Sequence, residues 1–393
     1  MGRFLVNRLI QAIVTIFVYM TVTFLILQAM PGNITVLYTN NPRITAEVRQ
    51  ELERRLGLDQ PWYMQYASYL KNFLSGSLGI SFSQYPRPVW DIIAERAPRT
   101  VVLFFTATVV SFYIGFLLGR IIAWRRGATV DYAATTVGVT FWTAFYPLLG
   151  LIVMWLFAYQ MKLFPLNQFI SPSVWRTASV SSNQVFGLML VNLALFALLL
   201  MVGYGLGIPR IGTVGGRALT QVGLWGGGLL ASGAWWVQSG LARYALDIAS
   251  HMVLPVFTLS LISFGGTMLL MRDSMLETIR EDYVMAARAR GLPDRVVRDR
   301  YAARTALLPV VTSFTLSIGG VVSGGIITET VFSWPGLGLT LLESARVYDY
   351  PLAVGAFVFT GVFVVLAHIV ADLLHAFLDP RLRVAGGEIT AAE

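Results

Sequence analysis

The feature that most constrains this chain is a series of long apolar segments that contain no Lys, Arg, Asp or Glu. Residues 100–119 form one of them, enclosed by Arg99 and Arg120. A helix needs about 20 mostly apolar residues to cross the roughly 30 Å of hydrocarbon in a bilayer. Only 13% of the 393 residues are charged, about half the fraction of a typical soluble domain. The sequence therefore predicts an all-α polytopic membrane protein.

Eight segments of this kind are predicted to lie in the membrane. Six are expected to be ordinary spans, and two form an extra helical hairpin that adds two crossings if it passes through the bilayer completely. The six lie at residues 9–29, 100–119, 132–160, 252–271, 306–328 and 351–371, and the hairpin lies at 177–209 and 218–241. An even number of crossings places both termini on one side.

The positions of Lys and Arg orient the predicted spans. The long segment before the second span is set aside, because the positive-inside rule applies to short loops. The remaining loops and the termini carry 17 Lys and Arg on one side and 4 on the other. Both termini are therefore predicted to be cytoplasmic, and this orientation would hold even if the hairpin dipped into the membrane and returned. The first helix is expected to be a permanent anchor, since no small-residue cleavage site precedes Pro31.

Composition changes divide the chain into six regions. Residues 1–33 form a first transmembrane helix with a cytoplasmic N-terminus, and residues 34–98 form an extracytoplasmic subdomain. Residues 99–176 contain the second and third core helices, and residues 177–245 contain the extra hairpin. Residues 246–383 contain the remaining core helices and a cytoplasmic loop at 272–305, and residues 384–393 form a cytoplasmic tail.

Several function classes are disfavoured by what the sequence lacks. It has no cysteine, which removes disulfides, thiolate metal sites and cysteine nucleophiles. The only lysines, Lys71 and Lys162, are not in a phosphate-binding glycine-rich loop. The net charge of +8 comes from arginines beside apolar spans, which favours a topological role over nucleic-acid binding. We therefore expect no catalytic residues, no metal site and no nucleotide site in this chain.

The inner loop at 272–305 carries eight arginines and six acidic residues. This near balance disfavours a simple site for anionic lipids. Glu281 and Asp282 suit the start of a helix, Gly291 suits its C-terminal cap, and Pro293 suits the opening of the next helix. The sequence predicts two short helices with a sharp bend between them.

On the first of these helices one face combines small residues with an aromatic ring, while Arg288 points elsewhere. That face is formed by positions i, i+3, i+4 and i+7, which are Tyr283, Ala286, Ala287 and Arg290. Two interpretations remain open from the residues alone. The loop is either a solvated segment with arginines beside the membrane or a docking surface for a cytoplasmic partner.

The stretch YVMAARARGLPDRVVRDRYAARTALLPVVT at 283–312 resembles the EAA-type cytoplasmic loop of ABC importer permeases, in the dipeptide, oligopeptide and nickel branch. The alanine pair, the glycine and the closing leucine-proline match that pattern at Ala286, Ala287, Gly291 and Leu308-Pro309. Met285 stands where the general pattern has glutamate. The stretches ITETVFSWPGLG at 327–338 and DLLHAFLDPRLR at 372–383 resemble the same branch. Residues 177–245 depart from it.

The resemblance implies a permease fold with six core transmembrane helices. It also implies that the inner loop is a coupling helix held by an ATP-hydrolysing subunit, with the coupling residues Tyr283, Met285, Ala286, Ala287, Arg288, Arg290, Gly291 and Leu292. A second group consists of Glu329, Phe332, Trp334, Pro335 and Gly336. These residues either form only an outer turn or belong to an outer gate or a contact with the binding protein.

The implied assembly contains a second, similar permease, two ATPase subunits and an extracytoplasmic substrate-binding protein, in the cytoplasmic membrane of a prokaryote. ATP and magnesium would bind to the ATPase subunits. Peptides are the expected substrate, and nickel and oligosaccharides are the alternatives within the branch. An ion-coupled carrier or channel is the alternative class, but Asp247, His251 and Glu329 lie near span edges, where interfacial roles are more common than proton relays.

Overall fold

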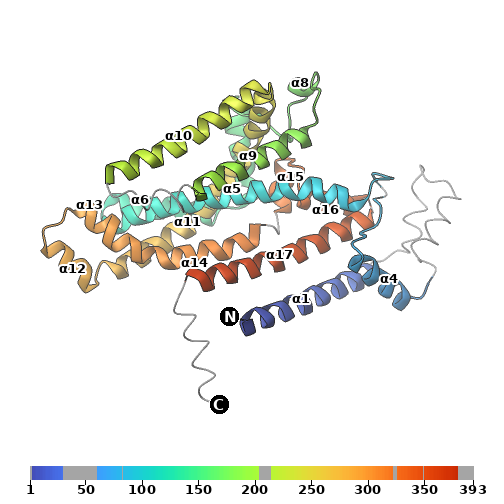
Figure 1. Cartoon of the computed structure of the whole chain (residues 1–393), viewed down its shortest axis with the longest axis horizontal. Coiled ribbons are helices and arrows are strands. Elements are labelled where there is room, and N and C mark those ends of the chain that lie inside the picture. Colours follow the sequence, from blue (N-terminus) through green and yellow to red (C-terminus); the bar gives the residue numbers. More distant parts are fainter. Residues whose placement is uncertain are drawn as a thin grey trace, which may run out of the picture. The chain divides into compact units, whose positions relative to one another are not determined.

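The computed structural model describes residues 2–29, 60–81, 83–202, 214–321, 325–347 and 349–378. All secondary-structure elements in these ranges are helices (Figure 1). The one β-type pairing among them is an isolated antiparallel bridge between Ile80 and Pro88. The prediction of an all-α chain is therefore confirmed for the described residues. The first part of the predicted outer subdomain, up to residue 59, and the tail at 384–393 lie outside them.

The first part of the chain contains α1 (Gly2–Ala29), α4 (Trp62–Leu74), α5 (Val89–Trp124), α6 (Thr129–Trp142), α7 (Tyr146–Met154), the π-helix η1 (Trp155–Gln160), α8 (Pro172–Trp175), α9 (Ser182–Val202) and α10 (Val214–Gln238). The second part contains α11 (Ala242–Thr278), α12 (Asp282–Ala289), α13 (Asp294–Val296), the π-helix η4 (Val297–Ala302), α14 (Ala303–Val321), α15 (Ile326–Val331), α16 (Leu337–Arg346) and α17 (Tyr350–Leu378).

Four helical segments in the described residues are long and apolar enough to cross a membrane. They are Val89–Trp124, Ser182–Val202, Ala242–Thr278 and Pro351–Ile369. A fifth is present if α6 and the helix from Tyr146 to Gln160 together make one crossing. Several apolar helices long enough to span a membrane are thus present among the described residues, as predicted, and the number of eight crossings stays a prediction.

The span predicted as one helix at 132–160 is broken in the structure. α6 ends at Trp142, and the next helix begins at Tyr146 with a bend of 104° between the two. Pro147 lies in the first turn of α7. Proline has no N–H to bond the carbonyl one turn earlier, which costs nothing in the first turn of a helix, so Pro147 favours the start of a new helix here. The span was predicted from its apolar composition alone, which does not indicate where a helix bends.

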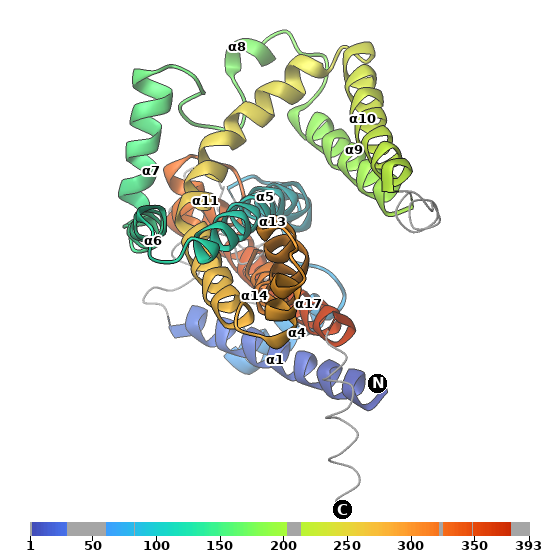
Figure 2. The ribbon, with the colours of Figure 1, turned by 90° about the vertical axis from the view of Figure 1, so that its left-hand side faces the viewer.

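The contacts divide the chain into two compact units. Unit 1 contains residues 1–151 and 256–393, and unit 2 contains residues 152–255. In unit 1, α14 packs against α5 and α17, and α17 also contacts α1 and α16 (Figure 2). α12 and α13 lie at one end of this bundle, and α15 and α16 lie toward the other (Figure 1). We call these the α12 end and the α15 end.

Close approaches at glycines hold α5 and α6 against α11 within unit 1. A Cβ at Gly115 or Gly119 of α5 would collide with the α11 backbone near Met268. A Cβ at Gly265 of α11 would collide with the carbonyl of Gly138 in α6, and one at Gly138 with the Met268 side chain. Because glycine lacks Cβ, the helix backbones approach more closely than larger residues would permit. The three helices therefore form one tightly packed group.

Unit 2 contains a pair of helices in the region where the sequence predicts a hairpin. Phe196 of α9 packs against Gly228 of α10, and Ser232 donates a hydrogen bond of 2.7 Å to Asn192. The contacts run in opposite directions along the two helices, so α9 and α10 are antiparallel. Elsewhere in this unit, Asp247 of α11 accepts hydrogen bonds from the indole N–H of Trp175 and the backbone N–H of Ser171.

Candidate functional site

The bend predicted in the inner loop is confirmed. α12 spans Asp282–Ala289 and ends in a turn in which the N–H of Gly291 donates to the carbonyl of Arg288 at 2.9 Å. Gly291 has a φ of +74°, in the left-handed region that suits a glycine after a helix C-terminus. Pro293 precedes α13 directly and occupies its N-cap position. Local signals were therefore sufficient to define this helix pair.

The residues of α12 divide into a buried and an exposed set. Val284 and Ala287 are buried, in a cluster with side chains of α11 and α14 that includes Met271, Met275 and Ala306. Leu292 is half-buried and packs on the same cluster. The exposed set of predicted coupling residues is Tyr283, Met285, Ala286, Arg288, Arg290 and Gly291. Ala287 thus helps to hold α12 on its own chain, while Met285, at 53% exposure, is open to contact.

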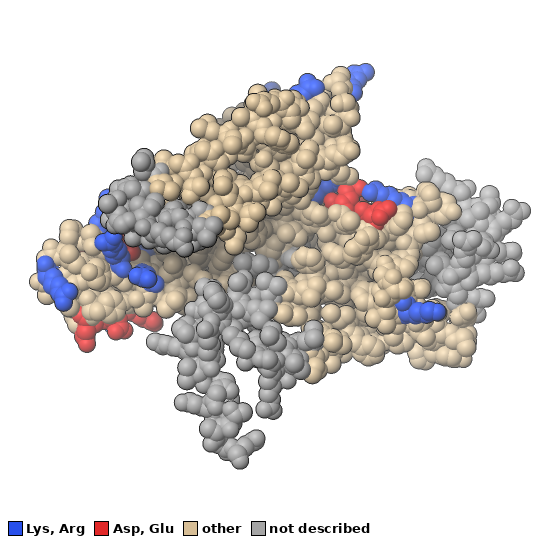
Figure 3. All heavy atoms as spheres, viewed as in Figure 1, with Lys and Arg blue, Asp and Glu red and all other residues tan. Residues whose placement is uncertain are grey.

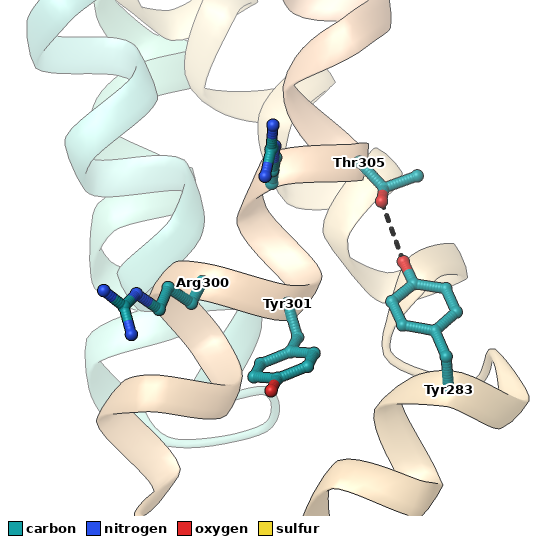
Figure 4. Close-up of a pocket in the computed structure, with 5 residues that line it drawn as sticks. Tyr283, Arg300, Tyr301 and Thr305 are labelled. Carbon is teal, nitrogen blue, oxygen red and sulfur yellow. Dashed lines mark hydrogen bonds between the residues drawn. The ribbon is translucent and has the colours of Figure 1, made fainter. Parts of the chain in front are cut away.

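Tyr283 links α12 to the start of α14. Its hydroxyl donates a hydrogen bond of 2.9 Å to Oγ1 of Thr305, and Figure 4 shows it reaching from one helix toward the other. The two residues line a pocket of about 390 Å³, together with Arg300, Tyr301 and Arg304. The pocket lies directly beside the predicted coupling helix.

Some arginines of this loop are neutralised within the chain. Arg298 donates two hydrogen bonds to Asp299, of 2.7 and 3.0 Å, and Arg120 and Arg295 also lie within 4.0 Å of that carboxylate. The hydrogen bond from Arg298 is the main reason that the pKa of Asp299 lies below its ordinary value. Arg288 lies 4.7 Å from the centre of the Trp124 ring, within cation–π range.

A buried ion pair joins α6 to α11 near this end. Arg272 donates to both oxygens of Asp131, with Nε···Oδ1 at 2.8 Å and Nη2···Oδ2 at 3.1 Å. The N–H of Gly127 donates to the same carboxylate at 3.0 Å. Asp131 is buried, so its charge requires these partners. Sequence reasoning missed this pair, although Asp131 is the only carboxylate between residues 96 and 246.

At the α15 end, the second predicted group is drawn into the interior. Glu329, Phe332, Trp334 and Gly336 are buried, and Pro335 is half-buried. Glu329 accepts hydrogen bonds from the hydroxyl of Thr100 at 2.7 Å and from the N–H of Leu339 at 2.8 Å. Thr100 is thereby held between Glu329 and the N–H of Leu337, which donates to its Oγ1 at 2.8 Å.

The same turn is fastened to α5 by backbone groups. The indole N–H of Trp334 donates to the carbonyl of Arg99 at 3.2 Å, and the carbonyl of Pro335 accepts longer hydrogen bonds from Arg96 and Arg99. A Cβ at Gly336 would collide with Glu329 and Thr100. The structure therefore brings this predicted group together, around α5 residues that sequence reasoning had not selected.

Charged residues concentrate at both ends of unit 1 on the face shown in Figure 3, and uncharged atoms cover the described surface between them. At the α12 end the charges lie on exposed helices that can meet a partner. At the α15 end some charged residues also lie on the surface, but Glu329 and Arg99 are buried and bonded within the chain.

Comparison with known proteins gives two family matches that together cover most of the chain. Residues 115–384 match "Binding-protein-dependent transport system inner membrane component", and residues 1–104 match the N-terminal region of such membrane components. The chain is 29% identical to the dipeptide transport system permease protein DppB of Escherichia coli K12, over 98% of this chain and 99% of that protein. It is 27% identical to the oligopeptide transport system permease protein AppB of Bacillus subtilis, over 97% and 99%.

Proposed function

Because the chain belongs to the family of inner membrane components of binding-protein-dependent transport systems, we propose that α12 is the helix through which separate ATPase subunits drive it. The chain is a multi-pass protein of the inner membrane and a permease subunit of an ABC importer.

One observation carries the coupling role. α12 presents Met285, Ala286 and Arg290 to solvent while Val284 and Ala287 anchor it to α11 and α14. A short helix held on one side and exposed on the other can be gripped by a partner and transmit its displacement. Small residues on the exposed side permit close approach, and the surrounding arginines provide charge complementarity to acidic groups.

The buried contacts behind α12 supply a path for that displacement. α11 leads directly into α12, and Arg272 ties α11 to α6 through Asp131. The glycine contacts described above hold α5 and α6 against α11. Closure of the ATPase subunits on ATP would then move these helices together and turn the pathway from inward-facing to outward-facing.

We propose an assembly of this chain with a second, similar permease, two ATPase subunits and an extracytoplasmic binding protein. The family description supports a binding protein and a membrane component. ATP and magnesium would bind to the ATPase subunits, and the translocation pathway would lie between the two permeases. The residues of the α15 end, around Glu329 and Trp334, would form the outer gate on that pathway.

The proposed topology has six core spans, an extra hairpin and cytoplasmic termini. In unit 1 the first residues of α1 and the last described turn of α17 point toward the α12 end, whereas α4 and α16 lie toward the α15 end (Figure 1). This arrangement supports a cytoplasmic location for both termini and for α12. It also supports an extracytoplasmic location for the segment that contains α4.

Peptides are the proposed substrate. The relatives named above are described as dipeptide and oligopeptide permeases, and the similarity extends over nearly the whole of each chain. A ligand released from the co-purified binding protein and identified by mass spectrometry tests this assignment. A nickel ion or an oligosaccharide in its place would contradict the peptide proposal and leave the coupling proposal intact.

The coupling role is tested by purifying the chain from its native membrane and measuring the ATPase subunits that accompany it. We expect Gly291→Val, or deletion of residues 285–291, to leave the chain inserted but to release the ATPase subunits or abolish transport. Gly240→Val is the matched control, because Gly240 also has a positive φ, of +70°, and no neighbour where a Cβ would stand. Intact assembly and transport after the deletion would refute the proposal and favour an ion-coupled carrier.

A further inference from the structure

The pocket beside α12 combines two arginines with hydroxyl groups and an aromatic wall. Arg300 and Arg304 line it with Tyr283, Tyr301 and Thr305. Figure 4 shows Tyr301 on the same helical segment as Arg300, with the pair of Tyr283 and Thr305 on its other side. All five side chains are exposed at the edge of the loop. The pocket is therefore accessible to a group from another molecule.

The two arginines differ from their neighbours in the same segment. Arg295 and Arg298 lie beside Asp299, whereas Arg300 and Arg304 have no carboxylate partner among the described residues. They lie four residues apart across the junction of η4 and α14, and both line the same pocket, so their like charges repel each other. A bound anion would relieve that repulsion. The planar guanidinium group is suited to bidentate hydrogen bonding with a carboxylate or a phosphate.

The hydroxyl pair adds a donor at the other side of the pocket. The Tyr283 hydroxyl donates to Oγ1 of Thr305, so the Thr305 hydroxyl proton is free to point at an incoming acceptor. The volume of about 390 Å³ admits a complete acidic side chain with bound water. The pocket thus offers positive charge on one wall and a hydroxyl donor on another.

Its position identifies which anion reaches it. Tyr283 belongs to α12, so a protein that grips the exposed side of α12 also covers the pocket. The exposed acidic residues Glu281 and Asp282 precede Tyr283 directly and would repel a bilayer surface of many anionic headgroups more strongly than a single carboxylate. We propose that the pocket receives an aspartate or glutamate side chain of the ATPase subunit, as a second anchor beside α12. This inference rests on the proposed coupling role of α12.

The test uses the complete complex purified from its native membrane into lipid nanodiscs. The variant Arg300→Ala with Arg304→Ala is compared with Arg125→Ala with Arg126→Ala, which removes two exposed arginines from the α5–α6 turn. Retention of the ATPase subunits is measured over increasing NaCl. We expect about tenfold weaker retention for the pocket variant, a typical sum for two partly exposed ion pairs, and a flatter dependence on salt. The control variant should match the wild type.

Charge reversal and charge conservation separate binding from folding. Arg300→Glu with Arg304→Glu should release the subunits more completely than the alanine pair, since it places like charges together. Arg300→Lys with Arg304→Lys should retain most of the affinity, because it keeps the charge and loses only the bidentate geometry. A lysine pair that behaves like the alanine pair would contradict the proposal, as would an alanine pair that behaves like the control.

A lipid phosphate is the competing occupant, and the nanodisc composition distinguishes it. The measurement is repeated in phosphatidylcholine alone and with one third phosphatidylglycerol. An effect of the alanine pair that persists in phosphatidylcholine supports a protein carboxylate, and an effect seen only with phosphatidylglycerol overturns the proposal. If the wild-type chain carries no ATPase subunit at all, the proposed coupling function fails. If the wild-type chain retains the ATPase subunits and the pocket variants retain them equally well, the proposed coupling function stands and the proposed second anchor is refuted.

Discussion

The two ends of unit 1 use polar residues in opposite ways. At the α15 end, Glu329 and Thr100 are buried and joined by a hydrogen bond within the chain. At the α12 end, Arg290, Arg300 and Arg304 are exposed, and none has a carboxylate partner among the described residues. A buried polar group must be satisfied by its own fold, whereas an exposed one is free to serve a partner. The buried groups of the first end thus support the fold, and the second end offers the exposed surface proposed above as the contact for a partner.

The sharpest test of this contrast is Glu329→Ala. It leaves the Thr100 hydroxyl and the Leu339 N–H without their acceptor and opens a cavity. We expect the free energy of unfolding to fall by about 3 kcal/mol or more, from unsatisfied groups and lost packing together. Thermal unfolding in detergent measures it, with Glu329→Gln as a milder control that keeps one acceptor oxygen. Wild-type stability for the alanine variant would show that the network is not structural.

Asp131→Asn tests whether buried architecture extends to the α12 end. It removes the charge that faces Arg272 but preserves volume. We expect a loss of about 1–3 kcal/mol, less than for a fully buried pair because Arg272 is 22% exposed. Transport per ATP hydrolysed should fall while the ATPase subunits remain bound. The charge swap Asp131→Arg with Arg272→Asp should restore part of the coupling. Release of the subunits by Asp131→Asn would instead place this pair in the contact surface.

The pH dependence of Asp299 is expected to be smaller. Its pKa is lowered by Arg298, so it contributes stability that is fully present above its unfolded pKa of about 4 and is lost as the pH falls through the lower folded value. Stability of the chain should therefore decline in this acid range. Asp299→Asn should reduce the decline, as followed by unfolding curves at pH 3 and pH 6. If Asp299→Asn lost as much stability between pH 6 and pH 3 as the wild type, the interaction of Asp299 with its arginines would not contribute to stability.

Met285→Asp should have the smallest effect on stability, within about 0.5 kcal/mol, because the side chain is exposed. Its effect on retention of the ATPase subunits should nevertheless be clear. Ala287→Asp is the contrasting variant, since it would bury a charge beside Met271 and Met275. If Met285→Asp destabilised the chain as strongly as Ala287→Asp, the division of α12 into an anchored and an exposed side would be wrong.

Local signals in the sequence predicted the helical membrane architecture and the shape of the α12 region. The length and apolar composition of the uncharged segments are sufficient to predict that they form membrane-spanning helices. The turn after α12 needs only a glycine that accepts positive φ and a proline two residues later. The orientation of the spans, the extent of the hairpin's passage through the membrane and the contact role of α12 remain predictions.

Tertiary structure decided which of these residues meet. Thr100 and Glu329 are 229 positions apart, and Asp131 and Arg272 are 141 positions apart. No periodicity or capping rule links residues at such separations, because their contact depends on how whole helices pack. The same packing buries Ala287 while its neighbour Ala286 stays exposed. The sequence by itself thus determined where the helices form, and only the packing of those helices decided which polar groups serve the fold and which remain available to a partner.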